Sequence, residues 1–112
     1  MIEHYEFGRM RVDGLSFLAD LIILPQMIRA SWWRQEGHRL VRADLEDVFR
    51  EELQVLVVGT GFFGLMKVDE DVKRAAREKG LELHVDKTKK AAALFNRLAG
   101  RKRTAGAFHL TC

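Results

Sequence analysis

The chain has very few of the residues that cross-link or interrupt a fold. Its 112 residues include one cysteine, Cys112, and one proline, Pro25. A single thiol excludes an internal disulfide framework and is typical of a reducing compartment. The longest apolar run, residues 21–25, is far shorter than the roughly 20 residues of a membrane-spanning helix. The start of the chain, residues 1–6, has neither a basic segment nor an apolar one, so we expect no secretory signal. We therefore expect one cytoplasmic domain over residues 1–112, without a membrane partner.

The chain also has little excess charge of either sign, because its formal net charge is only +3. The excess cations lie late in the chain, at Lys87, Lys89, Lys90, Arg97, Arg101, Lys102 and Arg103. The one aromatic residue among them, Phe95, belongs to the apolar stripe of the expected helix and is not available to stack on bases, which argues against nucleic acid as a partner. The cluster is better interpreted as a solvated helix face and loop.

The first half of the chain has strand patterns followed by an irregular stretch. Residues 5–12 resemble a strand, and Asp13-Gly14 is a favoured two-residue hairpin turn. Residues 15–19 return from that turn, and residues 21–24 predict a buried strand that ends at Pro25. Residues 26–42 have no regular pattern, and a short helix follows with Leu45, Val48 and Phe49 on one face.

From residue 53 the pattern alternates between strand and helix. Strands are predicted over 55–59, 81–85 and 105–110. Asp69 should cap a helix that ends at Gly80, and Thr88 should cap another that ends at Gly100. This order predicts three parallel strands joined by right-handed crossovers. We expect a three-layer α/β fold, with a mixed sheet, a C-terminal βαβαβ unit and an N-terminal β-hairpin region.

The stretch Gly59-Thr60-Gly61-Phe62-Phe63-Gly64 has the spacing of a dinucleotide-binding turn. In that fold the helix opens inside the motif and directs its free amides at a pyrophosphate. Here the first helix cap, Asp69, comes five residues after Gly64, and two more acids follow it. Close backbone packing is therefore the favoured interpretation, and no cofactor is expected. The loop still lies where open α/β sheets bind ligands, so Gly59, Thr60, Gly61, Phe62 and Gly64 form a candidate pocket.

The segment Trp32-Trp33-Arg34, with His38 close behind, has the composition of an interface anchor. Two adjacent tryptophans on an irregular segment cannot face one core alike, so one should pack inward and the other cover a pocket or partner. Arg34 could also bind a carboxylate or phosphate with two hydrogen bonds. We add Trp33, Arg34 and His38 to the candidate pocket.

His109 and Cys112 are a further candidate pair, because an imidazole can activate a thiol. Residues three apart on a strand face opposite sides, so the two meet only if the chain turns after Leu110. A small thiol without chemistry is the favoured interpretation. The remaining histidines are scattered, and no metal site is expected.

Four stretches together resemble one family. They are His4-Tyr5 with Phe7-Gly8, Trp32 to His38, Val57 to Val68, and Phe108-His109-Leu110-Thr111-Cys112. The chain resembles the Mth-type family of small domains of unknown function, which includes the human adipogenesis-associated Mth-domain protein. A distant mitochondrial branch contains an assembly factor of respiratory complex I, a role not transferred here because we expect no transit peptide. The resemblance implies a three-layer α/β fold with a mixed sheet and no established activity.

Two functional hypotheses remain open. The favoured one is a domain that acts through protein contacts, as a homodimer or in an assembly role. It is favoured because the chain has no complete catalytic constellation, which also leaves its status as an enzyme open. The alternative is an enzyme that binds a small molecule or anion at the Gly59–Gly64 loop.

Overall fold

The computed structural model, which describes residues 1–112, is built around β7 (Val55–Thr60), a strand whose residues are all buried. On either side β7 pairs in parallel with β10 (Thr104–His109) and β9 (Glu82–Asp86). β4 (Leu21–Ile23) pairs antiparallel with β10, and β5 (Ile28–Arg29) pairs antiparallel with β4. The sheet order is thus β5-β4-β10-β7-β9, which confirms the predicted mixed sheet and its three parallel strands.

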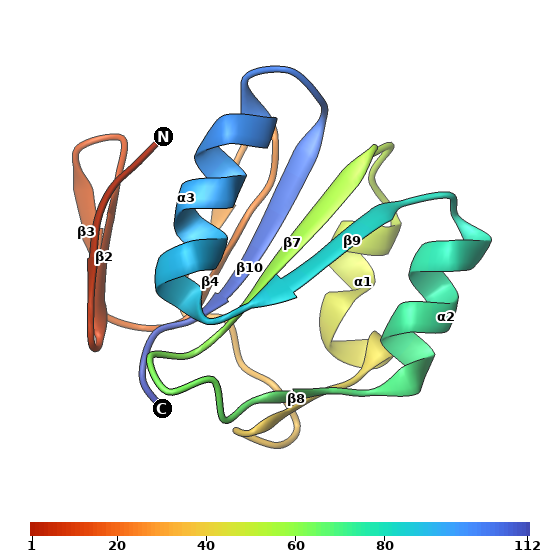
Figure 1. Ribbon diagram of the computed structural model, residues 1–112, viewed down its shortest axis with the longest axis horizontal. Helices are drawn as coiled ribbons and strands as arrows, with labels where there is room; N and C mark the ends of the chain where they lie inside the picture. Colours follow the sequence, from red (N-terminus) through yellow and green to blue (C-terminus); the bar gives the residue numbers. More distant parts are fainter.

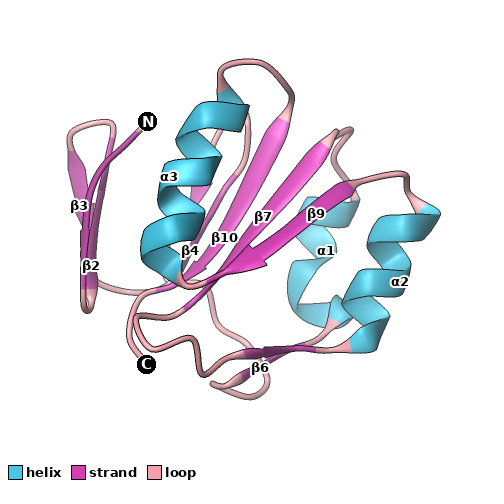
Figure 2. Cartoon of the chain, in the orientation of Figure 1, coloured by secondary structure: helices cyan, strands magenta, loops and turns pink.

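Helices cover both faces of this sheet, as the three-layer prediction requires (Figures 1 and 2). One face carries α3 (Thr88–Ala99), and the other carries α1 (Glu46–Phe49) and α2 (Glu70–Glu78). A 3₁₀ turn, η1 (Arg42–Leu45), leads into α1. None of the helices is long and apolar enough to cross a membrane.

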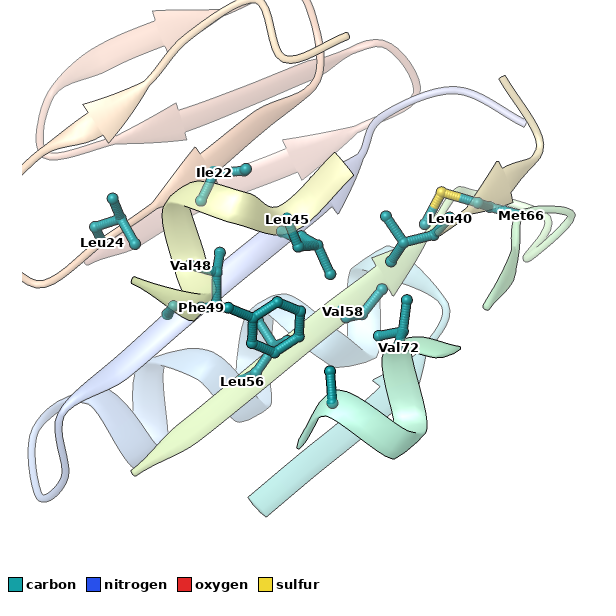
Figure 3. Close-up of a cluster of buried hydrophobic side chains, with 13 residues drawn as sticks. Ile22, Leu24, Leu40, Leu45, Val48, Phe49, Leu56, Val58, Met66 and Val72 are labelled. Carbon is teal, nitrogen blue, oxygen red and sulfur yellow. The ribbon is translucent and has the colours of Figure 1, made fainter. Parts of the chain in front are cut away.

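The period of two along β7 divides the core into two clusters. Leu56 and Val58 point to the side of α1 and α2, where Val48 and Val72 pack against them (Figure 3). Val55 and Val57 point to the other side, into a cluster with residues of α3 and of the N-terminal strands. Burial on both faces explains why this strand has no polar side chain before Thr60.

The N-terminal region differs from the prediction of one strand over residues 5–12. The chain turns at Phe7-Gly8, where Gly8 has φ +79°, and so forms β1 (Ile2–Glu6) and β2 (Arg9–Val12). Together with β3 (Leu15–Phe17) these strands make a separate antiparallel sheet in the order β1-β2-β3 (Figure 1). The hairpin therefore does not extend the mixed sheet; it packs beside α3. The predicted Asp13-Gly14 turn is confirmed, with positive φ at both residues.

Two short strands join the segments on either side of β7. β6 (Arg39–Leu40) and β8 (Lys67–Val68) pair in parallel, so the stretch predicted as irregular contains both β5 and β6. After β8 the chain enters α2 with Asp69 as the N-cap, whose carboxylate accepts a hydrogen bond from Asp71 N–H. The helix begins at Glu70, well beyond the glycine loop, as predicted.

Candidate functional site

The glycine loop leaves the carboxyl end of β7 and packs against the residues that follow β10. Gly61 has φ +106°, a conformation that L side chains rarely adopt. A Cβ at this position would lie 2.6 Å from the carbonyl group of Cys112 and 2.8 Å from Cδ2 of His109. Glycine is required here because the backbone of residues 109–112 passes directly over it.

The amides of this loop donate to other parts of the protein. Phe62 N–H donates to the Thr111 carbonyl at 2.6 Å, and Leu65 N–H to the Cys112 carbonyl at 3.0 Å. Gly61 N–H donates to Thr88 Oγ1 at 2.8 Å, and Gly64 N–H to the Gly61 carbonyl at 3.3 Å. A phosphate group in a glycine loop needs such amides free and directed at it. These four are used within the fold.

Thr88 has a different role from the predicted helix cap. The N-cap of α3 is Lys87, which makes no side-chain capping bond, and Thr88 is the first residue of the helix. The fully buried Thr88 hydroxyl accepts from Gly61 N–H and donates to the His109 carbonyl at 2.6 Å. The hydroxyl therefore joins the ends of β7 and β10 and is unavailable for capping.

A buried charged cluster, formed by Asp20, Arg34 and His109, lies at the end of β10. Asp20 Oδ2 is 2.7 Å from His109 Nδ1 and 2.8 Å from Arg34 Nη1. Asp20 Oδ1 accepts from Leu110 N–H at 2.7 Å. The short Asp20 contact indicates that His109 carries its proton on Nδ1. Asp20 was not predicted from the sequence, where its one signal is an acid placed immediately before the buried run 21–24.

Hydrogen bonding controls the ionisation of Asp20. Burial alone would raise the pKa of this carboxyl, but the hydrogen bonds from His109 and Leu110 N–H, together with the adjacent Arg34 guanidinium, outweigh burial and lower it. Nearby, burial raises the pKa of Tyr5 to about 12. The Tyr5 hydroxyl donates to the Leu110 carbonyl at 2.8 Å, so the N-terminal sheet is tied to the same chain segment.

The two tryptophans diverge around this cluster, as the sequence suggested. Trp32 packs inward, its Nε1–H donates to the Asp44 carbonyl at 3.0 Å, and the Arg34 guanidinium lies 4.8 Å from its ring centroid. Trp33 is 86% exposed. Arg34 is only 4% exposed and also donates to the Gly37 carbonyl at 2.8 Å. The buried ion pair thus fixes the backbone that turns Trp33 outward.

The other candidate residues have separate positions around the loop. The exposed His38 ring lies edge-on to His109, with centroids 5.9 Å apart. The structure therefore brings Arg34, His38 and His109 together beside Gly61. Cys112 turns back over the loop and is partly exposed, but no hydrogen bond joins its thiol to His109. No three His, Cys, Asp or Glu side chains are arranged to hold a metal ion.

Asp20 could orient the His109 imidazole as a general base, but no hydroxyl or thiol bonds to the second nitrogen of that ring. His109 Nε2 is buried and has no hydrogen-bond partner. A nucleophile-activating arrangement requires such a partner within reach.

A cavity of about 290 Å³ lies beside Arg34, between Asp20 and Trp33. A larger groove, of about 940 Å³, opens between the N-terminal sheet and β4–β5 and contains none of the candidate residues.

Exposed aromatic side chains gather near residues 110–112. We define the aromatic patch as Phe7, Phe62 and Phe63, whose ring centroids are 5.1 to 6.3 Å apart. Their exposed fractions are 50%, 43% and 58%. Gly8 N–H donates to the Leu110 carbonyl, so the turn that carries Phe7 and the loop that carries Phe62 are both bound to residues 110–112.

Comparison with solved structures finds this fold in proteins from several organisms. A conserved hypothetical protein from Pyrococcus horikoshii is 30% identical, with a TM-score of 0.85 over 100% of this chain and 99% of that one. A Bartonella henselae protein described as an outer membrane protein is 24% identical, with a TM-score of 0.83 over 99% and 94%. A Bordetella pertussis protein described as a Mth938-like domain is 20% identical, with a TM-score of 0.76 over 98% and 85%.

A family model extends this likeness to the sequence. The model described as protein of unknown function (DUF498/DUF598) matches residues 2–109, which is nearly the whole chain. The motifs that suggested the Mth-type family lie within or next to this range, and the Mth938-like neighbour has the same fold. The chain therefore belongs to the DUF498/DUF598 family of small α/β domains of unknown function.

Proposed function

We propose that this domain acts through protein contacts and forms a homodimer through the aromatic patch. The observation that supports the proposal is the exposure of three neighbouring phenylalanine rings, each between 43% and 58% accessible. Contiguous apolar surface on a soluble protein is commonly a site of interaction, and aromatic anchors contribute much of the binding energy at interfaces.

The side chains of the patch pack on one another within a single chain. Phe62 and Phe63 pack edge to face at 5.1 Å, and Phe7 packs edge to face on Phe62 at 6.0 Å. Tyr5 lies against Phe62 at 6.4 Å and is itself fixed by its hydrogen bond to Leu110. Side chains already ordered in the free protein lose little entropy on association, which favours binding.

A second copy of the chain is the partner that this surface suits best. In a two-fold dimer each patch meets its own equivalent, so like charges near the axis would repel. The three patch residues are uncharged, and the adjacent Leu65, 49% exposed, adds apolar surface. The lone free thiol, Cys112, is consistent with a reducing, cytoplasmic setting for such a dimer.

Sedimentation equilibrium over a range of protein concentrations tests the proposal. We expect a monomer–dimer equilibrium for the native chain and a dissociation constant at least about tenfold higher for Phe63→Ser, since hot-spot aromatics contribute roughly 2 kcal/mol or more. The matched control is Leu15→Ser, because Leu15 is also exposed but lies at the opposite end of the N-terminal sheet. A native chain that is monomeric at every concentration contradicts the proposal.

A further inference from the structure

Unused hydrogen-bonding capacity inside this protein is concentrated in one cluster. Three buried side-chain nitrogen atoms have no hydrogen-bond partner: Arg34 Nε, Arg34 Nη1 and His109 Nε2. Arg34 Nη1 is close to Asp20 Oδ2, at 2.8 Å, but is not aligned to donate to it. Buried polar atoms in folded proteins are nearly always paired, so this cluster of unpaired atoms, two of which are arginine donors, requires an explanation.

The cavity of about 290 Å³ described above, which we name the Arg34 cavity, has the Arg34 side chain in its wall. Its walls include Ala19, Asp20, Ser31, Trp33 and Arg34. Arg34 reaches it from a buried position, since only 4% of its side chain is exposed. A guanidinium carries five N–H donors and no acceptor, so a group that completes its bonding must supply acceptor atoms, as the oxygens of a carboxylate do.

We propose that the Arg34 cavity binds a small organic monocarboxylate with a planar or apolar body. The carboxylate oxygens accept hydrogen bonds from the unpaired Arg34 nitrogens, and the Trp33 indole lies against the body of the ligand. Charge-assisted bonds between arginine and carboxylate are among the strongest that proteins make. An exposed indole beside a buried cation supplies the apolar wall that such small-molecule sites need.

The neighbouring charge favours a carboxylate over a phosphate. Asp20 lies in the same wall, so the net charge of Arg34 and Asp20 together is zero, and a dianion would be repelled more than a monoanion. Asp20 Oδ2 lies 2.8 Å from Arg34 Nη1, but the hydrogen bonds that the Asp20 oxygens accept come from His109 Nδ1 and Leu110 N–H. The ligand therefore meets only the donors left unused on Arg34.

The proposal is tested by a nuclear magnetic resonance titration with benzoate as the probe. We expect benzoate to shift the Arg34 Nε–H and Trp33 Nε1–H signals saturably. We expect its dissociation constant to be at least tenfold lower than that of benzamide, which has the same shape without the charge. Benzamidine and inorganic phosphate should give no saturable shift. Equal affinity for benzoate and benzamide, or saturable binding of phosphate, overturns the proposal.

Two variants locate the binding in the cavity without disturbing the buried ion pair. Ala19→Phe fills the cavity from an exposed position and should raise the benzoate dissociation constant at least tenfold. Ala93→Phe adds the same ring to the exposed face of α3 and should leave benzoate affinity unchanged. Both titrations are repeated in the Phe63→Ser background, where self-association is weakened, so that failure of one proposal is distinguished from failure of the other. Benzoate binding that is unaffected by Ala19→Phe overturns the site.

Discussion

Gly61 and Thr88, 27 positions apart in the sequence, meet through one hydroxyl group. Gly61 N–H donates to Thr88 Oγ1 at 2.8 Å, and the same hydroxyl donates to the His109 carbonyl at 2.6 Å. The start of α3 therefore joins the ends of two neighbouring parallel strands, β7 and β10. The glycine spacing at this junction allows three chain segments to pass close together. This explains a nucleotide-like motif in a loop whose amides at Gly61, Phe62, Gly64 and Leu65 are bonded within the fold.

Replacing Thr88 with valine should destabilise the fold. The substitution keeps the shape of the side chain but leaves Gly61 N–H and the His109 carbonyl without their partner. Each buried unpaired group costs about 1–3 kcal/mol, so we expect a loss of roughly 2–4 kcal/mol in the free energy of unfolding. Thr88→Ser keeps the hydroxyl and should lose only about 1 kcal/mol. Urea denaturation measures both, and equal losses in the two variants would show that the hydroxyl contributes nothing.

Replacing Gly61 with alanine should also destabilise the fold, for a steric reason. The new Cβ would lie 2.6 Å from the Cys112 carbonyl group, and the residue would keep φ +106°. We expect a loss of about 2 kcal/mol or more. Gly100→Ala is the control, because Gly100 has helical backbone angles and a Cβ there would have no other atom within 4 Å. That control should gain about 0.5 kcal/mol; a similar loss at both sites would contradict the account.

Replacing Asp20 with asparagine should leave a buried arginine without its counter-charge. Removing one partner of a buried ion pair typically costs about 3–5 kcal/mol, and we expect a loss near the lower end because Asp20 is slightly exposed. The exposed pair of Lys73 and Glu70 provides a control, since Lys73→Gln should change the unfolding free energy little. Comparable losses for the two variants would show that the buried ion pair contributes no more to the free energy of unfolding than the exposed pair does.

The same variant should change the response of the fold to acid. The pKa of Asp20 is lower in the folded chain than its ordinary 3.8. Its contribution is therefore present above that value and is lost as the pH falls through the folded-state pKa. Asp69 and Glu82, whose pKa values are lowered by hydrogen bonds from Arg39 and His84, remain in both proteins. Between about pH 6 and pH 2 the native chain should lose more stability than Asp20→Asn; parallel curves would contradict this.

The ionisation of Tyr5 can be followed directly at alkaline pH, because it is the only tyrosine in the chain. Burial raises its pKa to about 12, against 10.0 for an unperturbed phenol. Its stabilising contribution is complete below about pH 10 and is lost as the pH rises toward 12. Absorbance of the phenolate should therefore appear about two pH units later in the folded chain than in urea. A midpoint near 10 in the folded chain would show that Tyr5 is not buried as described.

The parallel half of the fold could be predicted from sequence because each of its elements has a local cause. Val55 to Val58 form an apolar run long enough for a strand and too short for a helix, and Asp69 is followed by a helical pattern. The N-terminal half was less predictable. Residues 5–12 have an unbroken strand pattern, and only the positive φ of Gly8 shows that the chain turns there.

The candidate site could likewise be predicted only in part from local sequence patterns. The divergence of Trp32 and Trp33 follows from adjacency alone. The contacts of Asp20 with residues 109 and 110, about 90 positions later, depend on how β4 and β10 pair. Thr88 has the sequence context of a helix cap, but tertiary contacts with Gly61 and His109 take its hydroxyl. Long-range pairing of this kind leaves no periodic signal.

Residues 109–112 close the glycine loop, and we infer that the loop is not a nucleotide site. Amide signals of Gly61, Phe62 and Leu65, followed by hydrogen exchange and by titration with a nicotinamide dinucleotide, test it most directly. We predict slow exchange at all three amides and no saturable shift with the dinucleotide. Fast exchange together with saturable shifts at these amides would contradict the account.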